Sequence, residues 1–154
     1  MNKIKYGIVL AGLLTSLNLG TASWPVLQQL SKAKQADINC LAKNIYHEAR
    51  GESIKGQIAV AQVTVNRVQS GKFQSSICGA VYADRQFSWT LDKSKTVKDR
   101  KAWEAAVVIA TAVLTKSIHL PDFSALYFHT KQIKPRWSRA KRVVAQIGNH
   151  IFYA

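Results

Sequence analysis

The most informative stretch of the sequence is Ile45-Tyr46-His47-Glu48-Ala49-Arg50-Gly51-Glu52, where one predicted helix ends and the chain turns toward the next. Leu41, Ile45 and Glu48 recur at i, i+4 and i+7, so they share one face of that helix. The pattern therefore puts a carboxylate on the apolar stripe that faces the protein interior.

A carboxylate on an apolar face loses hydration of its charged form, so we expect the pKa of Glu48 to be raised. A raised pKa is what a general acid needs near neutral pH. The alternative is a Glu48 at the rim of the fold, solvated or paired with Arg50, and the spacing alone leaves both interpretations open.

The periodicity predicts a mainly helical α+β domain over residues 37–154. Helices are expected from about Asp37 to Arg50, from a Ser53 cap to about Ser70, after Ser75 or Ser76, and from about Val97 to Thr115. The second helix is apolar nearly all round and should be central, so Asn66 and Arg67 on it need hydrogen-bonding partners. Residues 125–130 and 147–153 are typical of strands, which predicts a small β-hairpin.

The composition is that of one globular domain, with 154 residues, 47% hydrophobic residues and 19% charged residues. The formal net charge of +14 indicates a polyanionic partner, either nucleic acid, an anionic membrane surface or a bacterial wall rich in acidic polymers. No acidic residue follows Asp122, whereas basic residues continue at Lys131, Lys134, Arg136, Arg139, Lys141 and Arg142. The alternative is a solvated basic face that only aids solubility.

The N-terminus is typical of a signal peptide over residues 1–22. Lys3 and Lys5 precede the apolar segment 7–14, and Gly20-Thr21-Ala22 offers small residues for cleavage before Ser23. The apolar stretch is short for a membrane span, and an uncleaved anchor is the alternative. Residues 23–36 would then form an N-terminal arm, and the mature protein would be periplasmic or extracellular.

Export makes a disulfide between Cys40 and Cys78 plausible, because the compartments outside the cytoplasm are oxidising. The alternative is Cys40 as a nucleophile, with His47, His129 or His150 as its base.

Aromatic residues lie beside amide and hydroxyl groups in Gln86-Phe87-Ser88-Trp89. Such a mixture suits sugar rings, which offer apolar faces for stacking and hydroxyls for hydrogen bonds. Core packing of Phe87 and Trp89 is the alternative.

Together these blocks resemble the cell wall hydrolase family of spore cortex-lytic enzymes (SleB-type), from about Cys40 to Tyr153. The motifs are Cys40-Leu41-Ala42, Ile45 to Glu52, Gly56 to Val63, Asn66-Arg67-Val68, Gln86 to Trp89, Tyr127-Phe128-His129, Pro135-Arg136-Trp137 and Ile147 to Tyr153. The resemblance implies a lysozyme-like fold related to lytic transglycosylases. It also implies cleavage of the β-1,4 bond between N-acetylmuramic acid and N-acetylglucosamine in peptidoglycan, with Glu48 as the catalytic acid.

Two-carboxylate glycosidases need a second acid across the scissile bond. Of the other carboxylates in the sequence, only Glu52 lies in one of these motifs. We expect Glu52 to be structural, paired with a basic neighbour. A lytic transglycosylase needs Glu48 alone, which protonates the leaving oxygen and then deprotonates the C6 hydroxyl to form a 1,6-anhydro sugar. A hydrolytic muramidase, including a phage endolysin, is the alternative.

The candidates for holding the sugar near Glu48 are Gln86, Ser88, Tyr127 and His129. The candidates for stacking on the sugar rings are Phe87, Trp89 and Trp137. We expect His47 to be a structural, hydrogen-bonding residue. The sequence lacks the second His of a zinc-peptidase motif after His47-Glu48, and we predict no metal and no cofactor. The expected partners of the monomer are peptidoglycan and an anionic wall or membrane surface, reached through the basic C-terminal segment. A nucleic-acid-binding or non-catalytic wall-binding protein is the rival class, and a signal sequence disfavours the first.

Overall fold

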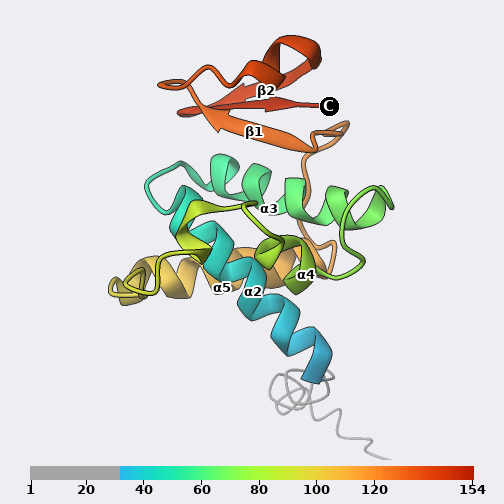
Figure 1. Ribbon diagram of the computed structural model, residues 1–154. Coiled ribbons are helices and arrows are strands. Elements are labelled where there is room, and N and C mark those ends of the chain that lie inside the picture. Colours follow the sequence, from blue (N-terminus) through green and yellow to red (C-terminus); the bar gives the residue numbers. More distant parts are fainter. Residues whose placement is uncertain (1–31) are drawn as a thin grey trace, which may run out of the picture. The chain divides into compact units, whose positions relative to one another are not determined.

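A computed structural model gives the fold and describes residues 32–154. The elements are α2 (Lys32–Ala49), α3 (Ile54–Gln69), α4 (Ile77–Tyr82), η1 (Ser88–Thr90), α5 (Arg100–Leu114), β1 (Tyr127–Thr130), η2 (Arg136–Ala140), β2 (Val143–Ile147) and β3 (His150–Tyr153). Within this part of the chain, the helices form a body and the sheet lies over α3 at one end of it (Figure 1). The predicted signal peptide and residues 23–31 of the predicted arm lie outside the described residues.

Helix α2 begins earlier than predicted, at Lys32, so residues 32–36 of the expected arm are helical. Asp37 is therefore not the N-cap. It lies inside the helix, and its Oδ1 accepts a hydrogen bond from the backbone N of Cys78 at 3.4 Å. Near this contact a disulfide joins Cys40 to Cys78 and links α2 to α4. Cys40 thus has no free thiol, which contradicts the alternative that it is a nucleophile.

Helix α3 is central, as predicted, because it packs against α2, α4, α5 and the sheet. Ser53 caps it by accepting a hydrogen bond from Gly56 N at 3.3 Å. At the other end, the amide nitrogen of Asn66 donates to the carbonyls of Phe123 (2.8 Å) and Ala125 (3.1 Å). These bonds fasten the segment that leads into β1 onto the helix.

The remaining helix starts are set by side-chain caps. Ser76 caps α4 by accepting from Gly79 N at 3.0 Å. Helix α5 begins at Arg100 rather than near Val97, because the Asp99 carboxylate accepts from Ala102 N at 3.0 Å. The Tyr46 hydroxyl accepts from the backbone N of Lys98 (3.1 Å) and Asp99 (3.0 Å), which holds those residues outside the helix.

The sheet has three antiparallel strands in the order β1-β3-β2, so the prediction of a two-stranded hairpin was incomplete. Strand β3 is the predicted partner of β1, with Phe128 opposite Phe152. The missed strand, β2, is joined to β3 by a tight turn at Gly148, whose φ of 56° is in the left-handed region that favours glycine.

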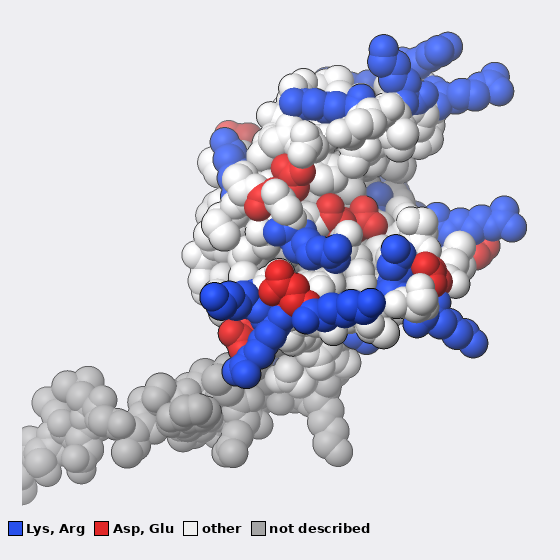
Figure 2. Space-filling view, turned by 90° about the vertical axis from the view of Figure 1, so that its left-hand side faces the viewer, with Lys and Arg blue, Asp and Glu red and all other residues white. Residues whose placement is uncertain are grey.

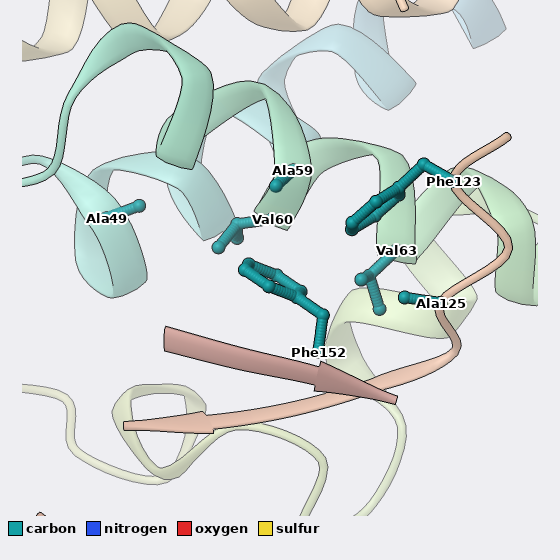
Figure 3. Close-up of a cluster of buried hydrophobic side chains, with 7 residues drawn as sticks. All are labelled: Ala49, Ala59, Val60, Val63, Phe123, Ala125 and Phe152. Atoms are coloured by element: carbon teal, nitrogen blue, oxygen red, sulfur yellow. The ribbon is translucent and has the colours of Figure 1, made fainter. Parts of the chain in front are cut away.

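A cluster of buried apolar side chains holds the sheet on α3 (Figure 3). Phe152 of β3 is fully buried and reaches toward Val60 and Val63 of α3. Its ring lies edge-on to Phe123, with 5.3 Å between the centroids. Loss of such a ring costs about 3–5 kcal/mol, so this cluster fixes the sheet relative to the helical body.

The predicted class, mainly helical α+β, is confirmed. Within residues 32–154, no helix is long and apolar enough to cross a membrane.

Candidate active site

Glu48 lies in the last turn of α2, on the face defined by the fully buried Leu41 and Ile45. Its side chain is partly exposed, because it lines a cavity. Burial raises the pKa of Glu48 from 4.5 to about 7, and the positive charge of Arg67 opposes part of that rise. The carboxyl group can therefore hold a proton near neutral pH.

The cavity has a volume of about 610 Å³. The residues that line it come from α2, α3, η1 and the segment before it, β1, and the segment between β1 and β2. They are Glu48, Arg67, Arg85, Gln86, Phe87, Ser88, Tyr127, Phe128, His129, Thr130, Ile133, Pro135, Trp137 and Lys141. Glu48 is the one carboxylate among them. The fold thus brings together most of the predicted site residues, which are far apart in the sequence.

Arg67 of α3 has the hydrogen-bonding partners that the sequence predicted for it, and it also lines the cavity, which the sequence did not predict. It is 3% exposed, and its Nε donates to the carbonyl of Leu126 at 2.7 Å. The guanidinium lies over the rings of Phe73 (5.4 Å) and Phe87 (5.6 Å). Burial lowers the pKa of Arg67 to about 10, so it stays cationic at neutral pH. The signal was present in the sequence, because a buried Arg on an apolar helix requires partners.

Gln86 lies against this guanidinium. With its amide oxygen turned toward Arg67, that oxygen accepts from Nη1 at 3.0 Å and from Nη2 at 3.3 Å. Arg67 thus has a backbone carbonyl, an amide oxygen and two aromatic faces as neighbours, and this arrangement holds its charge at the Glu48 end of the cavity.

Aromatic side chains form another part of the cavity lining. The ring of Tyr127 lies 5.7 Å from that of Trp137, and the Nζ of Lys141 lies 3.6 Å from the Tyr127 centroid. Trp137 is 37% exposed, so part of its face is open to a ligand. Ser88 also lines the cavity, where its exposed side chain offers a hydroxyl.

His129 lines the cavity but is 6% exposed, and both of its ring nitrogens are engaged. Nδ1 lies 2.8 Å from the carbonyl of Thr130, which can only accept, so Nδ1 carries the proton. Nε2 then accepts from the Tyr153 hydroxyl at 2.8 Å. This network holds the ring of Tyr153 beside Trp137, with 5.5 Å between the centroids.

Phe87 and Trp89 are core residues. Phe87 is 5% exposed and packs near Phe128, with 6.3 Å between the ring centroids, so it lines the cavity with little exposed surface. Trp89 does not line the cavity, because it is buried against His47, whose ring stacks on it at 4.5 Å. The core-packing alternative is thus the correct one for Trp89. His47 contacts the rings of Trp89 and Tyr46, so the hydrogen-bonding role that we expected for it stays a prediction.

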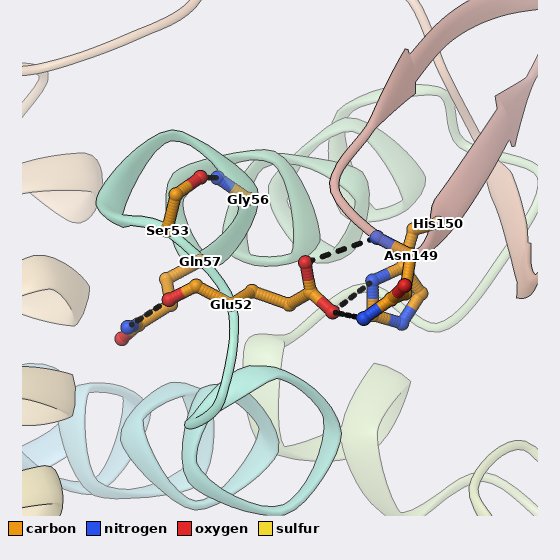
Figure 4. Close-up of polar contacts among 6 residues, drawn as sticks. All are labelled: Glu52, Ser53, Gly56, Gln57, Asn149 and His150. Atoms are coloured by element: carbon orange, nitrogen blue, oxygen red, sulfur yellow. Dashed lines mark hydrogen bonds and ion pairs between the residues drawn. The ribbon is translucent and has the colours of Figure 1, made fainter.

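Glu52 has a different environment from Glu48 (Figure 4). Its carboxylate accepts hydrogen bonds from the backbone N of Asn149 (3.1 Å) and from the Asn149 side chain (3.0 Å), and it lies 3.8 Å from His150 Nδ1. Asn149 lies in the β2–β3 turn and His150 is the first residue of β3, so the basic partner that we expected for Glu52 is His150, which is far from it in the sequence. Glu52 therefore fastens the α2–α3 turn to the sheet.

Basic side chains project from the sheet end of the molecule and from the helical body, and a hollow lies between the two (Figure 2). Lys131, Lys134, Arg136, Arg139 and Arg142 of the basic segment are exposed, and Lys141 is half-buried at the cavity. Within the described part of the chain, no group of three or more His, Cys, Asp or Glu residues is arranged to hold a metal ion.

The family of the chain follows from comparison with known proteins. The model of the Cell Wall Hydrolase family matches residues 51–153, which is more than half of the sequence. The chain belongs to this family. The matched range begins after Glu48, so the match itself says nothing about that residue.

The similar proteins include spore cortex-lytic enzymes. That of Oceanobacillus iheyensis is 34% identical over 136 residues (86% of this chain, 46% of the relative), and that of Bacillus cereus is 32% identical over 119 residues (77% and 44%). The chain thus spans about half the length of the curated relatives it matches.

Solved structures agree with the family and the fold. The catalytic domain of Bacillus cereus SleB is 30% identical, with a TM-score of 0.62 over 78% of this chain and 91% of that domain. The catalytic domain of the germination-specific lytic transglycosylase SleB from Bacillus anthracis is 30% identical, with a TM-score of 0.66 over 80% of this chain and 98% of that domain.

Proposed function

We propose that this protein degrades peptidoglycan by cleaving the β-1,4 bond between N-acetylmuramic acid and N-acetylglucosamine as a lytic transglycosylase. The observation that carries the proposal is Glu48, a carboxyl group with a pKa of about 7 in a cavity large enough for sugar residues. Membership of the Cell Wall Hydrolase family and similarity to a lytic transglycosylase support it.

In the first step, protonated Glu48 gives its proton to the glycosidic oxygen while the bond from that oxygen to C1 of muramic acid breaks. In the second step, the Glu48 carboxylate takes the proton of the C6 hydroxyl, whose oxygen forms the new bond to C1. The product is a 1,6-anhydro sugar, Glu48 regains its proton, and no water is consumed. Between the steps, the charge of Arg67 stabilises the Glu48 carboxylate.

The composition of the cavity favours this single-acid chemistry over a two-carboxylate mechanism. A hydrolytic glycosidase of the usual kind needs a second carboxylate across the scissile bond. Among the described residues that line the cavity, Glu48 is the one acid. The carboxylate of Glu52 does not line the cavity and accepts hydrogen bonds from Asn149 in the β2–β3 turn.

In this proposal, Tyr127 and Trp137 stack on sugar faces, and Ser88 hydrogen-bonds a hydroxyl or acetamido group. Gln86 and His129 act indirectly, because Gln86 orients Arg67 and His129 holds Tyr153. The proposal leaves Trp89 out of sugar binding.

The proposal also includes export, through the predicted signal peptide, to the periplasm or the cell exterior. There the monomer acts without a metal or a cofactor, and the exposed basic segment from Lys131 to Arg142 attracts it to anionic wall or membrane surfaces. Binding to purified sacculi that weakens as salt rises from 50 to 500 mM (about 14 Å to 4 Å of screening length) would support this role.

The deciding experiment compares the wild-type protein with Glu48→Gln on purified sacculi, with the released muropeptides identified by mass spectrometry. We expect anhydro-muropeptides from the wild type and a loss of at least about 100-fold in their release from the variant. Glu104→Gln is the matched control, because Glu104 lies on α5 and contacts Arg100 at 2.7 Å, away from the cavity. Substantial activity in Glu48→Gln would overturn the assignment of the acid, and hydrated reducing ends in place of anhydro ends would indicate a muramidase.

A further inference from the structure

The helical body carries a second cationic region, apart from the active-site cavity. Two clefts of about 250 and 340 Å³ adjoin there, and both are lined by His47, Lys95 and Thr96. None of the described residues that line these paired clefts also lines the active-site cavity. Five basic side chains line the paired clefts, and they are Lys43, Arg50, Lys93, Lys95 and Lys98.

Helix α2 separates the paired clefts from the active site. Lys43, His47 and Arg50 recur at i, i+4 and i+7, so they share one face of the helix and of the turn that ends it. The stripe of Ile45 and Glu48 is two residues out of step, which is about 200° around the helix. The proposed acid and the basic stripe therefore lie on roughly opposite faces of α2.

The other wall of the paired clefts is the segment between η1 and α5. Asp92 turns this segment, because its carboxylate accepts from Ser94 N at 2.9 Å and from Ser94 Oγ at 2.6 Å. The Tyr46 hydroxyl fastens its far end to α2 through the backbone N of Lys98 and Asp99. The segment therefore holds its lysines along the clefts.

The positive charge of the paired clefts is not neutralised within the described part of the chain. Asp92 is the one acid that lines them, and its carboxylate is hydrogen-bonded by Ser94. None of the five basic side chains has a carboxylate within 4.0 Å, since the ion pairs of residues 32–154 join other groups. Holding like charges close together costs free energy, which a bound anion would offset.

The ring of His47 experiences the resulting electrostatic field. Burial lowers the pKa of His47, and the positive charges of Arg50, Lys43 and Lys95 lower it further. The Arg50 guanidinium lies 4.9 Å from the centroid of the Tyr46 ring, which keeps its charge intact. Cations from α2 and from the segment before α5 thus act together where the two clefts meet.

We propose that the paired clefts form a second, non-catalytic site that binds a phosphodiester polymer of the cell wall. The chain belongs to the Cell Wall Hydrolase family, and chains of phosphate-linked polyols or sugars are attached to peptidoglycan in many bacterial walls. A phosphodiester stays negatively charged near neutral pH and recurs along such a polymer. Each cleft therefore takes one phosphate, and the Thr96 hydroxyl is available where the clefts meet.

The shape of the paired clefts favours a polymer over the other anions that a wall enzyme meets. They are recessed between α2 and the segment before α5, so a flat membrane surface would reach their rims and not their walls. Each has about half the volume of the active-site cavity, which suits a chain thinner than a glycan strand. A polymer bound there would hold the enzyme on the wall and leave the cavity free.

The test measures binding of the full chain to fluorescently labelled poly(glycerol phosphate) by anisotropy at low ionic strength, where exposed charges are least screened. The variants are Lys43→Gln, Lys95→Gln and the double variant. The matched control is the double variant Lys55→Gln, Lys72→Gln, which removes the same charge at exposed positions at either end of α3. A second double variant, Lys43→Arg with Lys95→Arg, keeps the cations.

We expect each single variant to raise the Kd about threefold and the double variant about tenfold. The double variant should also show a weaker dependence of Kd on salt. The matched control and the arginine variant should stay within about twofold of the wild type. Cleavage of polymer-free glycan strands should proceed at the wild-type rate in the double variant, because neither Lys43 nor Lys95 lines the cavity.

Wild-type affinity in the double variant, or an equal loss in the matched control, would overturn the site, because net charge alone would then explain binding. Slower cleavage of polymer-free strands by the double variant would also overturn it, since the two lysines would then act in catalysis. Tighter binding to phosphatidylglycerol vesicles or to single-stranded DNA, with the same dependence on these lysines, would overturn the wall polymer as the occupant. The binding assay needs no cleavage, so a failure of the proposed function would be recognised separately.

Discussion

The unusual state of Glu48 predicts that removing its charge stabilises the protein at alkaline pH. The pKa of Glu48 in the folded protein is about 7, against an ordinary value of 4.5. The folded state therefore binds the Glu48 proton more tightly than the unfolded state does. Its contribution to stability is fully present below pH 4.5 and is lost as the pH rises through about 7.

The magnitude follows from the difference between these pKa values, which corresponds to about 3 kcal/mol at full ionisation. Glu48 is partly exposed at the cavity, so we discount this figure to about 2 kcal/mol. Glu48→Gln has nearly the shape of the protonated side chain and cannot ionise. We therefore expect the variant and the wild type to be about equally stable at pH 4.5, and the variant to be more stable by about 2 kcal/mol at pH 8.5.

The assay is thermal unfolding followed by circular dichroism at several values of pH. For a domain of this size, about 2 kcal/mol corresponds to a rise in Tm of about 6–8 °C. Glu104→Gln is again the control, since its pair with Arg100 on α5 is largely exposed, and its Tm difference should not grow with pH. A difference between Glu48→Gln and the wild type that is the same at pH 4.5 and pH 8.5 would refute the reasoning.

Three further predictions concern Arg67, the turn at Gly148 and the disulfide. Arg67→Gln removes the cation that lowers the pKa of Glu48, so, if Glu48 is the general acid that we propose, the alkaline fall in kcat/KM should move up by about one pH unit; an unmoved pH profile would contradict this, and Arg67→Lys should keep the wild-type profile. Gly148→Ala should lower the free energy of unfolding by at least about 2 kcal/mol, because φ is 56° and an added Cβ would overlap a carboxylate oxygen; Gly51→Ala, with nothing within 4 Å, should be nearly neutral in urea titrations. Reduction of the bond between Cys40 and Cys78, which are 38 residues apart, should cost about 3–4 kcal/mol in the same titration, and an unchanged midpoint would show that the bond is absent in the purified protein.

Local features of the sequence were sufficient to predict much of the fold. Ser53 and Ser76 each cap a helix through a bond to a residue only a few positions away, so their roles can be read without tertiary information. The spacing of Leu41, Ile45 and Glu48 lies within one helix, α2, so it too could be read without tertiary information. It placed the Glu48 carboxylate correctly on a mostly buried face.

Strand β2 could not be recognised from alternation. It contains a register shift between Val143 and Ala145, and Val143 is 54% exposed. A bulge interrupts the two-residue period, and a partly exposed edge strand lacks a continuous apolar face. Its turn at Gly148 was the available signal.

The missed parts of the site depend on contacts across the sequence. Arg67 becomes a site residue only because Gln86 and Leu126 meet it in space. Trp89 was a candidate for sugar binding by its composition, yet its stacking on His47 places it in the core. Spacing along the chain indicates which face a residue is on, and not what lies opposite that face.

The disulfide has a consequence for damage to the chain. Glu48 and Arg67 both lie between Cys40 and Cys78, and so does the exposed turn at Gly71 and Lys72 that follows α3. If a protease cuts after Lys72, the peptide with the acid and the peptide with the sheet remain covalently joined, because the bond bridges the cut. A nicked molecule can therefore keep both walls of its cleft together.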